Sequence, residues 1–136
     1  MSAALPDGAA RLLDGPNFGY LATLMESGAP KVEPVWVARE EHRVLIVTDA
    51  ASIKAKNIHR DSRVALTVVA REQPYEHLLL RGRVVEVRPD DDMAVLDWFS
   101  QKYLGAPYPR RRWNSRIVIV IEPSVVRYHA PGHQSS

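Results

Sequence analysis

The sequence predicts a mainly β protein, an antiparallel barrel of six strands with helices attached. Runs of β-branched and aromatic residues recur along the chain, and short turns separate most of them. One long run, residues 77–88, contains Gly82, which is typical of a bulge or a barrel corner. With 136 residues, the chain is long enough for one domain with its own core. We therefore expect a single domain over residues 1–136, with flexible ends at about 1–8 and 131–136.

The composition excludes several classes of site. The sequence has no cysteine, which rules out disulfides, a thiolate nucleophile and a cysteine-based metal site. The net charge is only +2 and the basic residues are dispersed, apart from Arg110, Arg111 and Arg112, so nucleic acid is not an expected partner. We find no basic start followed by a long apolar run and no membrane-length segment, so we expect a cytoplasmic protein without a membrane partner.

The first half is expected to hold one short helix and three strands, at residues 9–13, 18–25, 31–38 and 44–48. The turn composition of residues 26–30 joins the first two strands into a hairpin. Pro34 lies inside the second strand and cannot donate to a ladder. It therefore marks an edge, a bulge or a position beside a ligand.

The second half is expected to alternate helix and strand, with helices at residues 52–60 and 89–104 and strands at 63–70, 77–88 and 116–129. Pro89 and the three aspartates after it are typical of a helix start, and Gly105 is a C-cap residue. The second helix carries an apolar face of Met93, Leu96, Phe99 and Tyr103. Pro123 interrupts the last strand.

The segment from residue 44 to residue 57 is the strongest candidate for an anion site. Its strand ends in a turn that leads to Ser52, which is placed to cap the next helix, and free backbone N–H groups at such a point bind anions. Lys54 and Lys56 follow, two of only four lysines in the chain. Lysines here are often merely solvated, and residues two apart on a helix point to roughly opposite sides. The pattern predicts a phosphate grip for a cofactor or nucleotide.

The order of the motifs resembles a known family. The sequence runs through GYLATL, PVW, TDAASIKAKN, DSRVALTVV, HLLLRGRV and KYLGAPYP. This series resembles the pyridoxamine-phosphate-oxidase-like split β-barrel proteins that bind flavin or deazaflavin, and within them the branch that uses the 5-deazaflavin coenzyme F-420. The resemblance extends from about Phe18 to Tyr128, and it depends on the order and spacing of the motifs more than on any one of them.

The resemblance implies a homodimer of FMN-binding-type split barrels with cofactor sites between the protomers. It implies an F-420-dependent oxidoreductase that transfers a hydride between the deazaflavin and an unsaturated small molecule, with no catalytic side chain and no metal. The implied phosphate and ribityl contacts are Val47, Thr48, Ser52, Lys54, Lys56 and Asn57. The implied ring contacts are Pro34, Val35 and Trp36, with His77 and Leu79 from the adjacent strand or the partner chain. Tyr103, Pro107 and Tyr108 would shape the substrate side.

Two departures from the family pattern limit which cofactor and which substrate we expect. Oxidases that use flavin mononucleotide place a basic residue directly before the loop lysine, whereas this chain has Ile53 there. This favours deazaflavin, with an FMN-dependent oxidoreductase as the alternative. Oxidases that act on pyridoxamine phosphate carry a substrate-binding Arg/His segment near their end, whereas this sequence stops soon after residues 116–129. We therefore do not expect pyridoxamine phosphate as the substrate. A carrier that binds flavin, deazaflavin or a tetrapyrrole without turnover is the remaining alternative. Residues 110–112 are either a solvated loop or a clamp for an anionic substrate or coenzyme tail.

Overall fold

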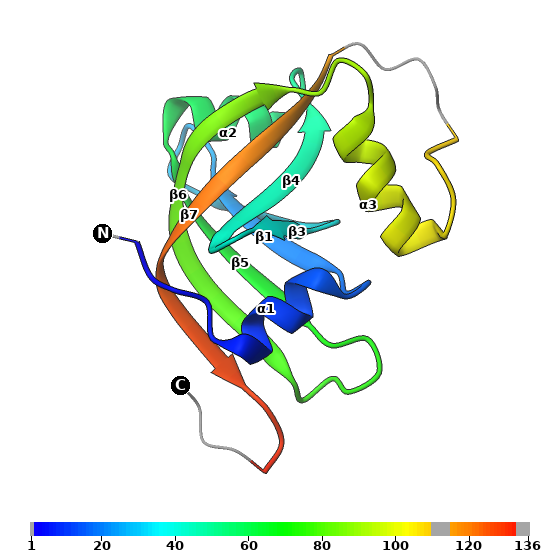
Figure 1. The fold of residues 1–136 in the computed structure, drawn as a ribbon. Coiled ribbons are helices and arrows are strands. Elements are labelled where there is room, and N and C mark those ends of the chain that lie inside the picture. The colour runs from blue at the N-terminus through cyan, green and yellow to red at the C-terminus, as the bar shows by residue number, and fades with distance from the viewer. Residues whose placement is uncertain (1, 110–114, 133–136) are drawn as a thin grey trace.

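Seven antiparallel strands form one sheet in the computed structural model, which describes residues 2–109 and 115–132 (Figure 1). The elements in chain order are α1 (Asp7–Asp14), β1 (Gly19–Leu24), β2 (Pro30–Val35), β3 (Ala38–Glu40), β4 (Arg43–Asp49), α2 (Ile53–Arg60), β5 (Arg63–Val69), β6 (His77–Pro89), α3 (Ala94–Leu104) and β7 (Arg116–His129). All ladders are antiparallel and connect the strands in the order β2-β1-β5-β6-β7-β4-β3.

The two ends of this strand order are joined by only two residues. β2 ends at Val35 and β3 begins at Ala38, so Trp36 and Val37 must carry the chain from one edge of the sheet to the other. Three Cα–Cα steps span at most about 11 Å. The sheet must therefore curl until its edges meet, which confirms the predicted mainly β split barrel. The prediction of six strands was wrong in one respect, because residues 31–38 form two strands on opposite edges.

Two apolar clusters pack against the sheet, one on its inner face and one on its outer face. The larger one fills the barrel interior, and α1 contributes Leu12 and Leu13 to it while α2 contributes Ile58. Figure 1 shows α1 across one opening of the barrel and α2 near the other. The smaller cluster lies between α3 and the outer face of β3, β4 and β7, where Phe99 is buried. Strand residues alternate between these two clusters, as the period of a pleated strand requires.

Gly82 sits at a close approach of β6 to β7. The register of the two strands shifts between Arg81 and Gly82, so the predicted irregularity is confirmed. A Cβ atom on Gly82 would lie 2.2 Å from the carbonyl oxygen of Glu122 in β7. Only glycine allows this approach, which lets the two long strands bend around the barrel.

Two predicted boundaries were wrong. Residues 89–93 are not helical, because Pro89 still pairs with Ile117 in the β6–β7 ladder and Met93 has a φ of 63°, so α3 begins only at Ala94. At the N-terminus, α1 begins at Asp7, ahead of the predicted start, and Leu5 is buried. The predicted flexible start is thus packed against the barrel from residue 3 onward.

The remaining boundaries agree with the sequence. Gly105 has a φ of 72° and donates its N–H to Gln101, as a C-cap does. The predicted tail lies largely outside the described residues, since residues 133–136 are not among them. Each described helix is too short or too polar to cross a membrane.

Replacing Gly82 tests the β6–β7 crossing. Gly82→Ala should lower the free energy of unfolding by about 2–4 kcal/mol, because the methyl group would overlap a backbone carbonyl that cannot move alone. Urea unfolding followed by circular dichroism measures this value. Ser124→Ala, at an exposed position of the neighbouring strand, is the control and should cost less than about 1 kcal/mol. Equal stability of Gly82→Ala and the native chain would refute the close approach.

Candidate functional site

The N-terminus of α2 presents unpaired backbone donors. Ser52 caps the helix, as predicted: its side chain accepts a 3.2 Å hydrogen bond from the N–H of Ala55 and a 3.3 Å bond from the Thr48 hydroxyl. Within residues 2–109 and 115–132, the N–H groups of Ile53 and Lys54 have no acceptor. Free donors and the positive end of the helix dipole make this turn suitable for an anion.

Lys54 points from this turn toward β2. Its Nζ lies 2.6 Å from Glu33 Oε1, and Lys31 Nζ lies 2.5 Å from Glu33 Oε2. Burial favours the neutral acid and raises the pKa of Glu33, but the two ammonium groups outweigh burial and hold the pKa below its usual value. Glu33 is thus ionised near neutral pH, and it holds Lys54 beside the open helix end.

The other two predicted residues of α2 lie elsewhere. Lys56 is exposed and lines a groove of about 520 Å³ between α2 and β6, on a different side from Lys54. Asn57 is 2% exposed, and its amide donates to Thr23 Oγ1 at 3.0 Å and accepts from Arg60 at 2.9 Å. The amide therefore ties α2 to β1. Of the three predicted residues, Lys54 alone faces the open turn and β2.

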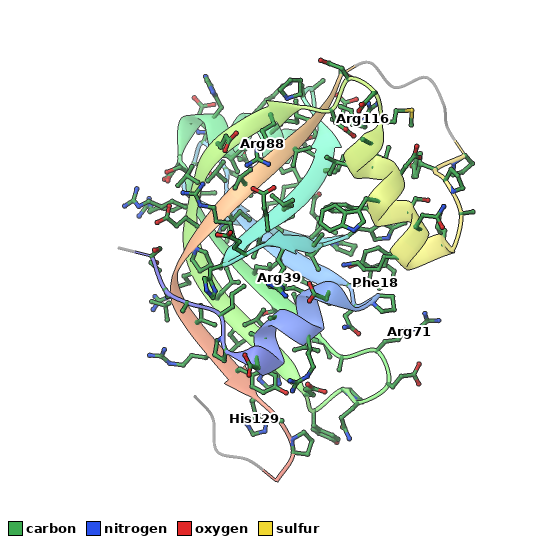
Figure 2. The ribbon with its side chains drawn as sticks, in the orientation of Figure 1. Phe18, Arg39, Arg71, Arg88, Arg116 and His129 are labelled. Carbon is green, nitrogen blue, oxygen red and sulfur yellow. The ribbon has the colours of Figure 1, made fainter. Side chains whose placement is uncertain are left out.

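A cluster of four aromatic rings lies where β2 ends and α3 packs against the sheet. Figure 2 labels one of them, Phe18, near the end of α3. Trp36 stacks on Tyr103, with ring centroids 4.9 Å apart and an interplanar angle of 5°. Phe18 stacks on the same tyrosine at 5.8 Å, and Tyr108 meets Trp36 edge-on at 6.0 Å. Pro107 is exposed beside Tyr108. The structure therefore brings a residue predicted for the cofactor ring together with those predicted for the substrate.

Backbone groups of Val37 fix the end of α3 that carries this cluster. The Tyr103 hydroxyl accepts from Val37 N–H at 2.9 Å and donates to Asn17 carbonyl oxygen at 2.6 Å. The neighbouring Lys102 Nζ donates to the carbonyls of Leu13, at 2.7 Å, and Val37. Burial raises the pKa of Tyr103 to about 12, so its hydroxyl keeps its proton at neutral pH.

A buried ion pair fixes the other end of α3. Arg116 Nε lies 2.9 Å from Asp90 Oδ2, and both side chains are nearly inaccessible. Asp90 also accepts hydrogen bonds from the N–H groups of Val95 and Leu96, at 3.1 and 3.0 Å. The predicted role of the aspartates at the helix start is confirmed for Asp90. Because both ends of α3 are anchored, Tyr103 is held rigidly against Trp36.

The remaining predicted strand residues divide between the two faces of the sheet. Val35 is buried in the barrel core, and Val47 packs on the α3 side. Pro34 pairs with Tyr20 on the outermost strand, so the predicted edge position is confirmed. Tyr20 is itself 42% exposed on the outer face. Sequence reasoning did not single it out, although an aromatic residue at an outward strand position is a usable signal.

Leu79 shares the outer face with Pro34, but at a distance. The ladders place Pro34, Tyr20, Thr67 and Leu79 in one row across β2, β1, β5 and β6. Three strand spacings separate the two ends of the row by about 14 Å. His77 lies one row further along β6, with its ring 5.3 Å from the ring of His129. Figure 2 labels His129 at the end of β7. A single chain therefore does not bring His77 or Leu79 into contact with Pro34.

This outer face is largely open. Tyr20, Val32 and Leu79 are 42%, 66% and 44% exposed. Two shallow grooves of about 570 and 360 Å³ cross it, and Arg81 lines both of them. Several large apolar side chains exposed on one face of a sheet are typical of an interaction surface. Within the described residues, no group of three side chains has the arrangement of a metal site.

The family model for pyridoxamine 5'-phosphate oxidase matches residues 5–130. The chain belongs to the pyridoxamine 5'-phosphate oxidase family. This is a family of flavin-binding split barrels, which accords with the curled sheet and with the resemblance found in the sequence. A comparison with curated proteins gave no match.

Solved structures support the same assignment. An F-420 reductase is 28% identical, with a TM-score of 0.81 over 90% of this chain and 98% of its own. A conserved hypothetical protein from Mycobacterium tuberculosis is 22% identical, with a TM-score of 0.74 over 93% and 85% of the two chains. General Stress Protein 26 from Bacillus anthracis is 18% identical, with a TM-score of 0.72 over 96% and 95%. The last two support the fold alone.

The anchoring of α3 predicts a pH-dependent stability. Burial lowers the pKa of Lys102 to about 8, although Asp14 acts in the opposite direction. The unfolded chain keeps this proton up to about pH 10.4. Between these values the unfolded state binds more protons, so the free energy of unfolding should rise as the pH increases from 8 to 10.

Lys102→Met removes this titration. The free energy of unfolding of the native chain minus that of the variant should increase from pH 7.5 to pH 9.5. Urea unfolding at each pH measures both values. Lys56→Met, which changes an exposed lysine, is the matched control and should not alter the pH profile. A difference that is constant over this range would show that Lys102 does not titrate in this way.

Proposed function

We propose that this chain is an oxidoreductase that uses coenzyme F-420 and transfers a hydride between the deazaflavin and an unsaturated small molecule. The observation that carries the proposal is the position of Lys54 at the open end of α2, in contact with the β2 strand that leads to Trp36. An anion site and an aromatic surface are thus linked by one short strand. The similarity to an F-420 reductase at 28% identity supports the same cofactor.

The residues present fit a phosphate-bearing flavin or deazaflavin. The phosphate would contact Lys54 and the N–H of Ile53, while Ser52 keeps the turn in place. From Glu33 to Trp36 the backbone advances by three residues, or about 10 Å, which suits a ribityl chain. The ring would then lie near Pro34 and Trp36 at the edge of the sheet.

The chain would bind and orient rather than donate protons. When bound, the deazaflavin supplies the hydride acceptor or donor itself. Trp36, held in place by its stack on Tyr103, would offer a flat apolar surface that positions a conjugated substrate and excludes water. Tyr108, which meets Trp36 edge-on, would border the substrate. The proposal assigns no catalytic acid or base to the protein.

A second copy of the chain would complete the site. Leu79 and Pro34 share one open face but lie about 14 Å apart within a protomer, so a single ring cannot contact both. Pairing of two outer faces would cover Tyr20 and Val32 and bring Leu79 and His77 of one copy toward Trp36 of the other. The proposal is therefore a homodimer with two shared sites.

Ile53 distinguishes the two cofactors within this proposal. A hydrophobic side chain directly before Lys54 leaves fewer positive charges for the phosphate than a basic residue would provide. An FMN-dependent oxidoreductase is the alternative, which the flavin-binding family supports. Binding of F-420 without oxidation or reduction of any substrate in a broad screen would instead favour a carrier.

Titration tests the cofactor directly. The purified protein should bind F-420 with a Kd in the micromolar range or below, and binding of neither F-420 nor FMN would refute the proposal. Lys54→Ala should weaken F-420 binding by about tenfold or more, since a charge-assisted contact to the phosphate is lost. Lys56→Ala is the matched control and should change the F-420 affinity only slightly. Equal affinities of the native chain and Lys54→Ala would remove Lys54 from the site.

A charge placed on the outer face tests the dimer. Leu79→Glu should convert the protein to monomers in analytical ultracentrifugation and weaken F-420 binding, because two carboxylates would be buried between the copies. Leu104→Glu alters a leucine of similar exposure (55% against 44%) at the end of α3 and should leave the dimer intact. A native chain that sediments as a monomer, or a dimeric Leu79→Glu variant, would contradict this interface.

A further inference from the structure

We infer that Glu33 makes the anion site selective for a phosphate with one negative charge over a phosphate with two. The inference deepens the proposed function and depends on it, since it concerns the phosphate that Lys54 would hold. The phosphate of F-420 is a diester and carries one charge. The phosphate of FMN is a monoester and carries close to two at neutral pH. Glu33 would thus reject FMN.

The charges around Lys54 support this selectivity. The ammonium groups of Lys31 and Lys54 contact the two oxygens of one carboxylate, Glu33, at 2.5 and 2.6 Å. Two positive charges and one negative charge leave a net charge of +1. That net charge matches a monoanion. A dianion would exceed it and place its second charge beside a carboxylate.

The carboxylate is held where this repulsion would be felt. Glu33 Oε1 is a buried oxygen on the Lys54 side, and no described residue gives it a hydrogen bond of regular geometry. It therefore depends on the Lys54 ammonium for its stabilisation. A phosphate that approaches Lys54 must share that ammonium with Glu33, and like charges repel strongly when water is partly excluded.

One further carboxylate, Asp49, lies at the end of β4, just before the turn into α2, where it accepts hydrogen bonds from Ala51 N–H at 2.7 Å and from the Ser115 hydroxyl at 2.6 Å. Its charge adds to that of Glu33, and the cations near this site do not cancel the effect. On α2, the Arg60 guanidinium is bonded to the carbonyl of Leu24 and to Asn57, while Lys56 and His59 line the groove on the β6 side. On β1, the inward side chain opposite the Lys31 backbone is the uncharged Thr23. Among the described residues, Glu33 is the one carboxylate within ion-pair distance of either lysine.

The test compares three ligands that differ in phosphate charge, namely riboflavin, FMN and F-420. Each ligand is titrated at pH 8 into the native protein and into the Glu33→Gln variant. Glu33→Gln should tighten FMN binding by about fivefold to tenfold and F-420 binding by about twofold or less, with riboflavin unchanged. Lys31→Gln should act in the opposite direction and weaken FMN more than F-420. Glu26→Gln, in the exposed β1–β2 turn, is the control and should leave all three affinities unchanged.

A second readout separates charge selection from a structural role. At pH 5 the FMN phosphate is mostly a monoanion, because its second pKa is about 6. The Lys31 and Lys54 ammonium groups hold the pKa of Glu33 below its usual value, so Glu33 keeps more of its negative charge at this pH than an ordinary glutamate. At pH 5, Glu33→Gln should therefore tighten FMN binding by no larger a factor than it tightens F-420 binding. His59→Gln changes the histidine of α2 and is the control: in this variant the affinity for FMN should depend on pH as it does in the native protein. The same advantage at both pH values would overturn the inference.

The outcomes distinguish this inference from the proposed function. If the native protein binds neither F-420 nor FMN, the proposed function fails. If it binds F-420 but Glu33→Gln changes the FMN and F-420 affinities by equal factors, only the inference about Glu33 fails. If Glu33→Gln does not fold, Lys31→Gln decides: equal effects on both cofactors would refute the selectivity, and a larger loss for FMN would support it.

Discussion

The two-residue connection of Trp36 and Val37 is the constraint on which the rest of the structure depends. It joins opposite edges of the sheet, so the sheet must close into a split barrel. The Val37 N–H donates to the Tyr103 hydroxyl and the Val37 carbonyl accepts from the Lys102 ammonium, and these bonds dock α3. The Trp36 indole ring forms the centre of the aromatic cluster. Barrel closure, the position of α3 and the candidate ring site are therefore consequences of one short segment.

The candidate site combines rigid and adjustable parts. Tyr103 and the start of α3 are held by hydrogen bonds and by the buried pair of Asp90 and Arg116. The Lys54–Glu33 contact is different, because a ligand anion can compete for the ammonium. Pre-organised aromatic surfaces suit a ring that must be oriented for hydride transfer, whereas an exchangeable ion pair suits a ligand that binds and leaves.

Much of the fold and part of the site could be predicted from the sequence because they depend on local patterns. Ser52 before a helix and Gly82 in a long strand each have a local physical cause, and both predictions were confirmed. The break at Trp36 was missed, since residues 35–38 are one continuous apolar run with no breaker after Pro34. The change of partner strand there is a property of the closed sheet rather than of the local sequence.

The ionic contacts of the site were also beyond local reasoning. Glu33 and Lys54 are 21 residues apart on a strand and a helix, so no periodicity relates them. A carboxylate inside a strand next to a proline is a weak signal on its own. The separation of Lys54 from Lys56, in contrast, follows from helical geometry and agrees with the structure.

The most direct test of this account is a crystal structure of the protein grown with F-420. The account predicts two copies related by a twofold axis, each cofactor lying between them, with its phosphate at Lys54 and the N-terminus of α2 and its ring beside Pro34 and Trp36. A phosphate bound away from Lys54, or a cofactor enclosed by a single copy, would contradict it.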